Sequence, residues 1–150
     1  MKIIIDHATD PSHLKVKICL VHCLDPRFKE AHDLFKKSYE IVDAISLAGG
    51  AKWLATPSSP GHEFVLGQIA DVVKAHNVPE VALMVHENCA MYKGNLDGVQ
   101  DEHEFLCAEL INAKENVTRF LAERSIENVP VNIYLVTLDG IKKIEEPVFN

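Results

Sequence analysis

The decisive stretch of this sequence is Val81-Ala-Leu-Met-Val-His86-Glu-Asn-Cys89. Its first part, residues 81–85, is a short and continuous apolar run, as expected for a strand that a parallel sheet buries on both faces. His86 and Cys89 follow the run with two residues between them. Zinc prefers imidazole and thiolate ligands, and a pair at this spacing can bind one ion from a single turn. The stretch therefore predicts a buried strand that leads directly into two metal ligands.

Further apolar runs of strand length, rich in β-branched residues, occur elsewhere in the chain, and segments with helical patterns separate them. Strands that alternate with helices indicate βαβ units with right-handed crossovers. The sequence therefore predicts an α/β fold with a central, mostly parallel sheet of four to five strands flanked by helices. The expected strands are residues 16–23, 41–47, 81–85 and 131–138, and the expected helices are residues 28–37, 61–75 and 98–124.

Polar residues mark the expected starts of two helices. Ser59 and Pro60 resemble an N-cap followed by proline at the first helical position. Asp97 and Gln100 have the spacing of a capping box at the start of the longest helix. The acidic run at residues 101–104 is interpreted as the first turn of that helix, where negative charge suits the helix dipole.

The overall composition is that of a globular protein. The chain has 150 residues, of which 47% are apolar and 25% are charged, so we predict a single domain over residues 1–150. The formal charge is −7, and basic residues form no cluster longer than a pair. Binding to a phosphate backbone depends on clustered positive charge, so the sequence argues against a nucleic-acid partner.

The apolar runs also argue against a membrane location, because a helical span needs roughly 20 apolar residues. Residues 1–6 are too short for the apolar core of a secretory signal, and we therefore predict a cytoplasmic protein. In that compartment the four cysteines are expected to be thiols, ligands or catalysts rather than disulfides. Cys19 and Cys107 are interpreted as small core residues without a functional role.

The end of the first expected strand supplies a third metal ligand. In open α/β sheets, ligands bind beyond the carboxyl ends of the strands, where the connections diverge. If the first and third strands are neighbours, Cys23 converges with His86 and Cys89. Two thiolates and one imidazole leave one position of a zinc tetrahedron for water or a carboxylate, which is the pattern of a catalytic site. His22 is excluded from the predicted site because strand alternation points it away from Cys23.

Asp25 and Arg27 follow Cys23 and are expected to lie beside the metal. As alternate residues of an extended segment they would project to the same side and pair. Asp25 would then orient a water on the zinc, with Arg27 keeping its carboxylate ionised and aimed. The same carboxylate could instead bind the zinc as a fourth ligand and close the site. The sequence is compatible with either role of Asp25.

Together these residues resemble the paired signature of the β-class carbonic anhydrases. The resemblance implies that Cys23, His86 and Cys89 bind one zinc ion, and that Asp25 and Arg27 act as a gate and orienting pair. It also implies a sheet of strand order 2-1-3-4. The matching residues are Cys23-x-Asp25-x-Arg27, His86-x-x-Cys89 and, more weakly, the turn Ala48-Gly49-Gly50.

What the resemblance implies for function is the reversible hydration of carbon dioxide to bicarbonate by a zinc-bound hydroxide, in a homodimer or a dimer of dimers. The chain departs from the family pattern at Ser46 and Leu47, where an Arg-Asn pair is usual, and at Ala90, where glycine is usual. Two alternatives follow. One is a zinc hydrolase of another small electrophile, such as carbon disulfide or carbonyl sulfide. The other is a non-catalytic zinc domain in which Asp25 is a permanent fourth ligand.

Overall fold

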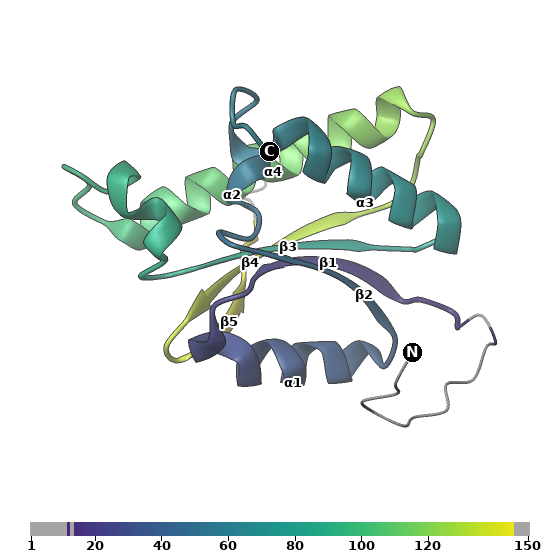
Figure 1. Ribbon diagram of the computed structural model, residues 1–150, viewed down its shortest axis with the longest axis horizontal. Coiled ribbons are helices and arrows are strands. Elements are labelled where there is room, and N and C mark those ends of the chain that lie inside the picture. Colours follow the sequence, from purple (N-terminus) through teal and green to yellow (C-terminus); the bar gives the residue numbers. More distant parts are fainter. Residues whose placement is uncertain (1–11, 13, 146–150) are drawn as a thin grey trace, which may run out of the picture.

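The computed structural model describes residue 12 and residues 14–145 of the chain. Its centre is a five-stranded sheet of order β2-β1-β3-β4-β5, in which the first four strands are parallel and β5 runs antiparallel to β4 (Figure 1). This confirms the predicted α/β class and the predicted order of the first four strands. The strands are β1 (Ile18–Cys23), β2 (Val42–Leu47), β3 (Val81–His86), β4 (Val131–Thr137) and β5 (Gly140–Lys143).

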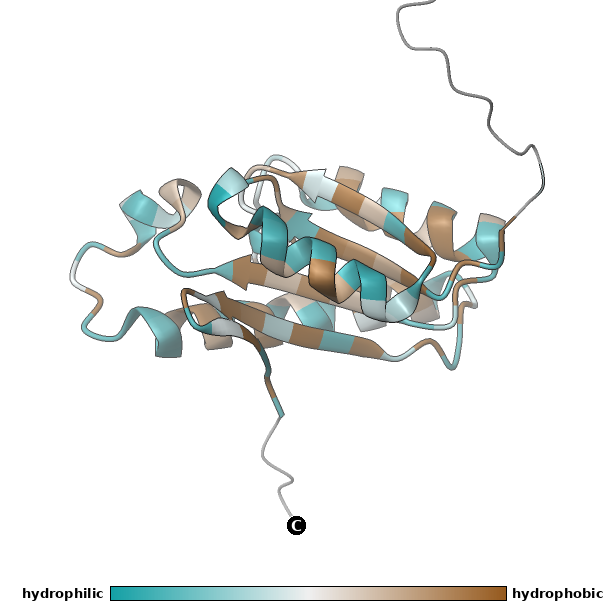
Figure 2. Ribbon diagram, turned by 90° about the horizontal axis from the view of Figure 1, so that it is seen from below, coloured by the Kyte–Doolittle hydropathy of each residue, from teal (hydrophilic) through white to brown (hydrophobic). Residues whose placement is uncertain are grey.

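Helices cover both faces of the sheet. Helix α1 lies on one face, and α2, α3 and α4 lie on the other (Figure 1). The view onto α1 shows a helix of mostly hydrophilic residues in front of largely hydrophobic strands (Figure 2). The helices are η1 (Pro26–Phe28), α1 (Lys29–Tyr39), α2 (Lys52–Ala55), α3 (His62–His76), η2 (Ala90–Asn95) and α4 (Glu102–Glu123).

The central strands are buried on both faces because their apolar runs have no polar alternation. All six residues of β1 and all six of β3 are buried. Successive side chains of β1 enter opposite cores, since Ile18 and Leu20 pack with Phe28 while Cys19 and Val21 pack with the larger core on the other face. The edge strand β2 is only half-buried.

The helix starts differ from those expected. The N-cap of α4 is Asp101, whose carboxylate accepts a 3.0 Å hydrogen bond from the Glu104 amide, so the prediction of a capping box at Asp97 and Gln100 was wrong. The N-cap of α3 is Gly61, without a side-chain hydrogen bond, rather than Ser59. The single-turn helix α2 and the short strand β5 were not predicted.

The sheet opens between its two central strands. The ladder between β1 and β3 ends at the pair Val21 and Leu83, although the strands continue to Cys23 and His86. The turn after β2 occupies the space between their ends, where the amide of Ala51 donates a 3.0 Å hydrogen bond to the Met84 carbonyl. The carboxyl ends of β1 and β3 are therefore separated, with the turn after β2 between them. We call this separation of the two strand ends the notch.

Within residues 14–145, no helix combines the length and the apolarity that a membrane crossing requires. Residues 1–6, from which the cytoplasmic location was predicted, lie outside the described residues.

Candidate metal centre

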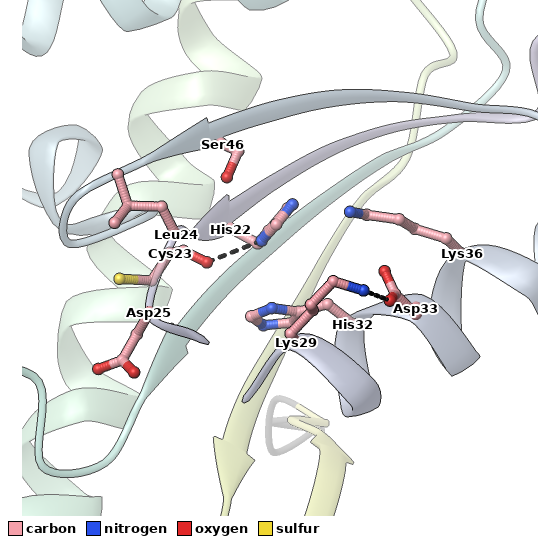
Figure 3. Close-up of a pocket in the computed structure, with 9 residues that line it drawn as sticks. All are labelled: His22, Cys23, Leu24, Asp25, Lys29, His32, Asp33, Lys36 and Ser46. Atoms are coloured by element: carbon pink, nitrogen blue, oxygen red, sulfur yellow. Dashed lines mark hydrogen bonds and ion pairs between the residues drawn. The ribbon is translucent and has the colours of Figure 1, made fainter. Parts of the chain in front are cut away.

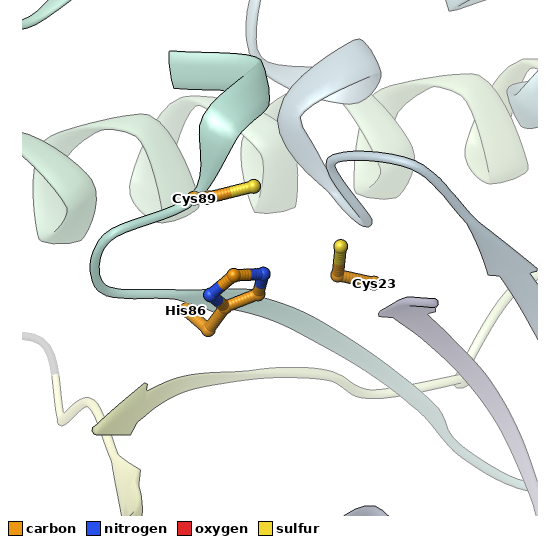
Figure 4. Close-up of side chains that lie close together, drawn as sticks. All are labelled: Cys23, His86 and Cys89. Atoms are coloured by element: carbon orange, nitrogen blue, oxygen red, sulfur yellow. The ribbon is translucent and has the colours of Figure 1, made fainter. Parts of the chain in front are cut away.

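Three of the predicted ligands lie together in the notch (Figure 4). Cys23 comes from the end of β1, His86 from the end of β3, and Cys89 from the turn that follows β3. One ligand atom from each lies within 4.8 Å of the other two, and all three side chains are buried. Among the described residues, this is the one group of three or more histidine, cysteine or acidic side chains with metal-ligand spacing.

The backbone fixes the orientation of the His86 ring. Its Nδ1 lies 2.8 Å from the Glu87 carbonyl oxygen, so Nδ1 carries the proton and the lone pair is on Nε2. Nε2 is buried and has no hydrogen-bond partner. An unpaired buried nitrogen is costly, and a metal ion would supply the partner that it lacks. His86 therefore fits the role of a metal ligand.

The two sulfur atoms are also suited to a metal. A hydrogen bond with Cys89 lowers the pKa of the Cys23 thiol, and the same contact raises the pKa of Cys89. The opposite directions arise because the two thiols share one hydrogen bond, so the pair loses its first proton more easily than an isolated cysteine does. The amide of Gly49 donates a 3.3 Å hydrogen bond to the Cys23 sulfur, which further stabilises the thiolate. Gly49 follows β2, so the glycine turn contributes directly to the site.

Asp25 and Arg27 form a close ion pair beside the three ligands. The Nη2 of Arg27 lies 2.7 Å from Asp25 Oδ2, and Nε lies 3.1 Å from Oδ1. The hydrogen bonds from Arg27 lower the pKa of the Asp25 carboxyl to about 2, so it is ionised throughout the neutral range.

The local structure that forms this pair is a turn rather than the extended segment that was predicted. Asp25 is the N-cap of η1 and accepts a 3.0 Å hydrogen bond from the Arg27 amide, while Pro26 sets the first residue of the turn. The pair thus depends on capping and not on strand alternation.

The Asp25 carboxylate lies at the edge of the candidate metal position. Its Oδ2 is 3.8 Å from Nε2 of His86, and its side chain is 19% exposed. The same oxygen is held by Arg27. Arg27 also donates a 2.9 Å hydrogen bond to the Asn88 carbonyl, which belongs to the turn between His86 and Cys89. Asp25 is therefore close enough to act at the metal but is held by Arg27.

A small pocket of about 200 Å³ adjoins Cys23 and Asp25 (Figure 3). Its lining includes His22, His32, Lys36 and Ser46. His22 was predicted to lie outside the metal site. Its ring packs against that of His32 at a centroid distance of 4.4 Å and an interplanar angle of 51°, and it is not in the group of three ligand side chains. Burial lowers the pKa of both imidazoles.

The residues that depart from the carbonic anhydrase pattern lie around the site without entering the ligand set. Ser46 lines the small pocket, and the Leu47 carbonyl accepts hydrogen bonds from the amides of Leu24 and Gly50. Ala90 is the first residue of η2 and is exposed. Because Leu47 acts through its main chain, its side-chain identity does not determine how the turn is held.

Sequence reasoning missed two contributions to the site, the Gly49 amide and the carboxylate of Glu102. Glu102 accepts a 2.7 Å hydrogen bond from the amide of Asn88. Main-chain donors carry no signal in the sequence. Glu102 belongs to an acidic run that the start of a helix explains equally well.

No protein-family model matches the sequence, and a search of curated proteins finds no relative. The fold is similar to that of β-carbonic anhydrase isoform I from Trichomonas vaginalis, with a TM-score of 0.57 and 18% identity over 93% of this chain and 87% of that chain. A tetrameric β-carbonic anhydrase from Sordaria macrospora matches with a TM-score of 0.54 and 17% identity, over 89% of this chain and 83% of that chain. The apo form of a carbon disulfide hydrolase matches with a TM-score of 0.50 and 12% identity, over 91% of this chain and 82% of that chain. These similarities establish that the chain has the β-carbonic anhydrase fold.

Proposed function

We propose that this protein is a zinc lyase that catalyses the reversible hydration of carbon dioxide to bicarbonate. In this proposal Cys23, His86 and Cys89 hold the ion, and Asp25 and Arg27 act beside it. The observation that carries the proposal is the combination of three buried ligand atoms within 4.8 Å of one another and an ionised carboxylate 3.8 Å from one of them.

When bound, zinc lowers the pKa of a coordinated water, so that a nucleophile for carbon dioxide is available near neutral pH. The protein must then orient that nucleophile and prevent Asp25 from blocking it. Asp25 is an acceptor in the neutral range because Arg27 keeps it ionised. Its Oδ2 can accept a hydrogen bond from the water proton, which directs the oxygen lone pair toward the substrate. Arg27 holds Asp25 in the orienting position by pairing with both carboxylate oxygens.

The direct test is stopped-flow carbon dioxide hydration by protein of verified zinc content, between roughly pH 6 and pH 9, where a water on zinc titrates. We expect zinc-dependent activity that rises with pH. Full zinc occupancy without activity at any pH in this range would refute the proposal and favour a non-catalytic zinc domain or another substrate.

A second candidate is hydrolysis of a related small electrophile, carbon disulfide or carbonyl sulfide. The fold similarity to a carbon disulfide hydrolase supports this candidate. The same site residues would serve, because both reactions begin with attack on the carbon of a linear, weakly polar molecule. Zinc-dependent release of hydrogen sulfide from carbon disulfide, without carbon dioxide hydration, would favour it over the lyase.

We further propose a homo-oligomer, either a dimer or a dimer of dimers, that acts in the cytoplasm on a small-molecule substrate. The tetrameric state of the Sordaria macrospora protein supports an oligomer. Sedimentation analysis of the zinc-loaded protein tests the oligomer, since a monomer at micromolar concentration would contradict it.

A further inference from the structure

The turn that carries His86 and Cys89 is held through the two residues that bind no metal. The Glu87 carboxylate accepts a 2.6 Å hydrogen bond from the amide of Leu138 and lies 2.5 Å from the His103 ring. Its side chain is thereby tied to the β4–β5 turn and to the start of α4. Glu87 thus fixes the half of the turn that follows His86.

Asn88 fixes the other half through its main chain. Its φ of 55° is in the left-handed region, which asparagine tolerates better than most residues. In this conformation its amide donates a 2.7 Å hydrogen bond to Oε1 of Glu102, the first residue of α4. Its carbonyl accepts a 2.9 Å hydrogen bond from Nη2 of Arg27. A single residue therefore receives one contact from α4 and one from the Asp25–Arg27 pair.

Arg27 is shared between two acceptors. Its Nη2 donates to the Asn88 carbonyl and also to Oδ2 of Asp25, the oxygen that lies 3.8 Å from His86 Nε2. The Arg27 side chain is 53% exposed, so packing alone does not restrain the guanidinium. The hydrogen bond to the Asn88 carbonyl therefore attaches the guanidinium to the turn between His86 and Cys89 while it pairs with Asp25.

We propose that Glu102 is a positioning residue for the Asp25 gate: it anchors the Asn88 peptide, the peptide holds Arg27, and Arg27 keeps Asp25 off the metal. This inference rests on the proposed function, because it assumes an ion bound by Cys23, His86 and Cys89. Without the Glu102 carboxylate, the Asn88 amide loses its acceptor and its carbonyl is no longer fixed. Arg27 then keeps its hydrogen bonds to Asp25 but loses its fixed attachment to the turn, so the equilibrium shifts toward the closed site, in which Asp25 is the fourth ligand.

The test uses full-length protein loaded with cobalt(II), whose visible spectrum reports the coordination of the ion, and azide as a probe of the open coordination position. Glu102→Ala removes the acceptor. Glu102→Gln keeps an oxygen at the same reach, and Glu102→Asp keeps the charge at the helix start but shortens the reach. Glu104→Ala is the matched control, because Glu104 is an exposed residue of the same helical turn.

We expect Glu102→Ala and Glu102→Asp to need about tenfold more azide for the same spectral change, the effect of losing one hydrogen bond. Glu102→Gln and Glu104→Ala should stay within about twofold of the parent protein on the same reasoning. In the double variant Glu102→Ala with Asp25→Asn, the azide response should return to that of Asp25→Asn alone, because the competing carboxylate is gone.

An unchanged azide response in both Glu102→Ala and Glu102→Asp would overturn the inference. So would a weakened response that Asp25→Asn does not restore, because the effect would then not pass through the gate. Cobalt binding and azide titration do not depend on turnover. A protein that shows the Glu102 effect but does not hydrate carbon dioxide would therefore refute the proposed activity and leave this inference standing.

Discussion

Replacing Gly50 with alanine should damage the fold and the metal site together. Gly50 has a φ of +54°, and a Cβ there would lie 2.5 Å from the Met84 carbonyl oxygen and 2.8 Å from the Cys23 amide nitrogen. Both contacts are with main chain, which cannot rotate away as a side chain can. The Cβ would therefore push apart the ends of β1 and β3, the two strands that carry the ligands.

Two costs determine the magnitude. The left-handed conformation costs an alanine about 1–2 kcal/mol. Forcing an extra methyl group into closely packed surroundings costs about 1–3 kcal/mol more. The expected loss in the free energy of unfolding is their sum, about 2–5 kcal/mol, a large part of the about 5–15 kcal/mol that a typical domain has.

Urea unfolding, followed by circular dichroism, measures this loss. Gly67→Ala is the matched control, because Gly67 lies in α3 and a Cβ there has no atom within 4 Å. In a helix interior that exchange should stabilise by about 0.5–1 kcal/mol. A Gly50→Ala variant that loses less than about 1 kcal/mol and binds zinc normally would show that the strand ends can separate without cost, contrary to this reasoning.

Other predictions address the site and its surroundings. Cys89→Ala should abolish tight zinc binding and destabilise the protein, because the ion loses one of three protein anchors; stoichiometric zinc in the purified variant would contradict the ligand assignment. Asp25→Asn should keep zinc but lose most of the turnover, whereas loss of zinc would make Asp25 a structural ligand. Burial lowers the pKa of His32 to about 4, so the folded protein favours the neutral imidazole. The resulting contribution to the free energy of unfolding is complete above the unfolded pKa of about 6.5 and is lost as the pH falls toward 4. Between pH 7 and pH 5 that loss is about 2 kcal/mol, and urea unfolding should show a smaller loss in His32→Phe than in the parent protein, because the variant keeps only His22, whose pKa is also lowered.

Much of the fold could be predicted because most of the parallel strands are largely continuous apolar runs. An apolar run of this length can be identified from the sequence without an alternating pattern and without knowing which strands pair. Strand β5 has no such signal, since its half-exposed residues end in Lys142 and Lys143 and it is defined by pairing with β4. Helix α2 is a single turn, too short for a periodic pattern. The predicted start of α4 was wrong because Asp97 and Asp101 are both plausible N-cap residues, and only the backbone conformation distinguishes them.

The candidate ligands could be predicted because cysteine and histidine at that spacing carry the chemistry in their side chains. The parts of the site made by main chain could not. The amide of Gly49, the carbonyl of Asn88 and the close approach at Gly50 depend on backbone conformation, which residue type restricts only weakly. Asn88 precedes η2 in the chain and Glu102 follows it, so no short-range sequence pattern connects the two residues. An acidic residue at a helix start is also explained by the helix dipole alone.

The notch between β1 and β3 is bounded by main chain, since the Ala51 amide donates a hydrogen bond to the Met84 carbonyl and a Cβ at Gly50 would meet the Cys23 amide nitrogen. The side chains of Ser46 and Ala90 take no part in these contacts. A substitution at either position would therefore leave the strand ends in place, whereas a side chain at Gly50 would displace the main chain that carries the ligands.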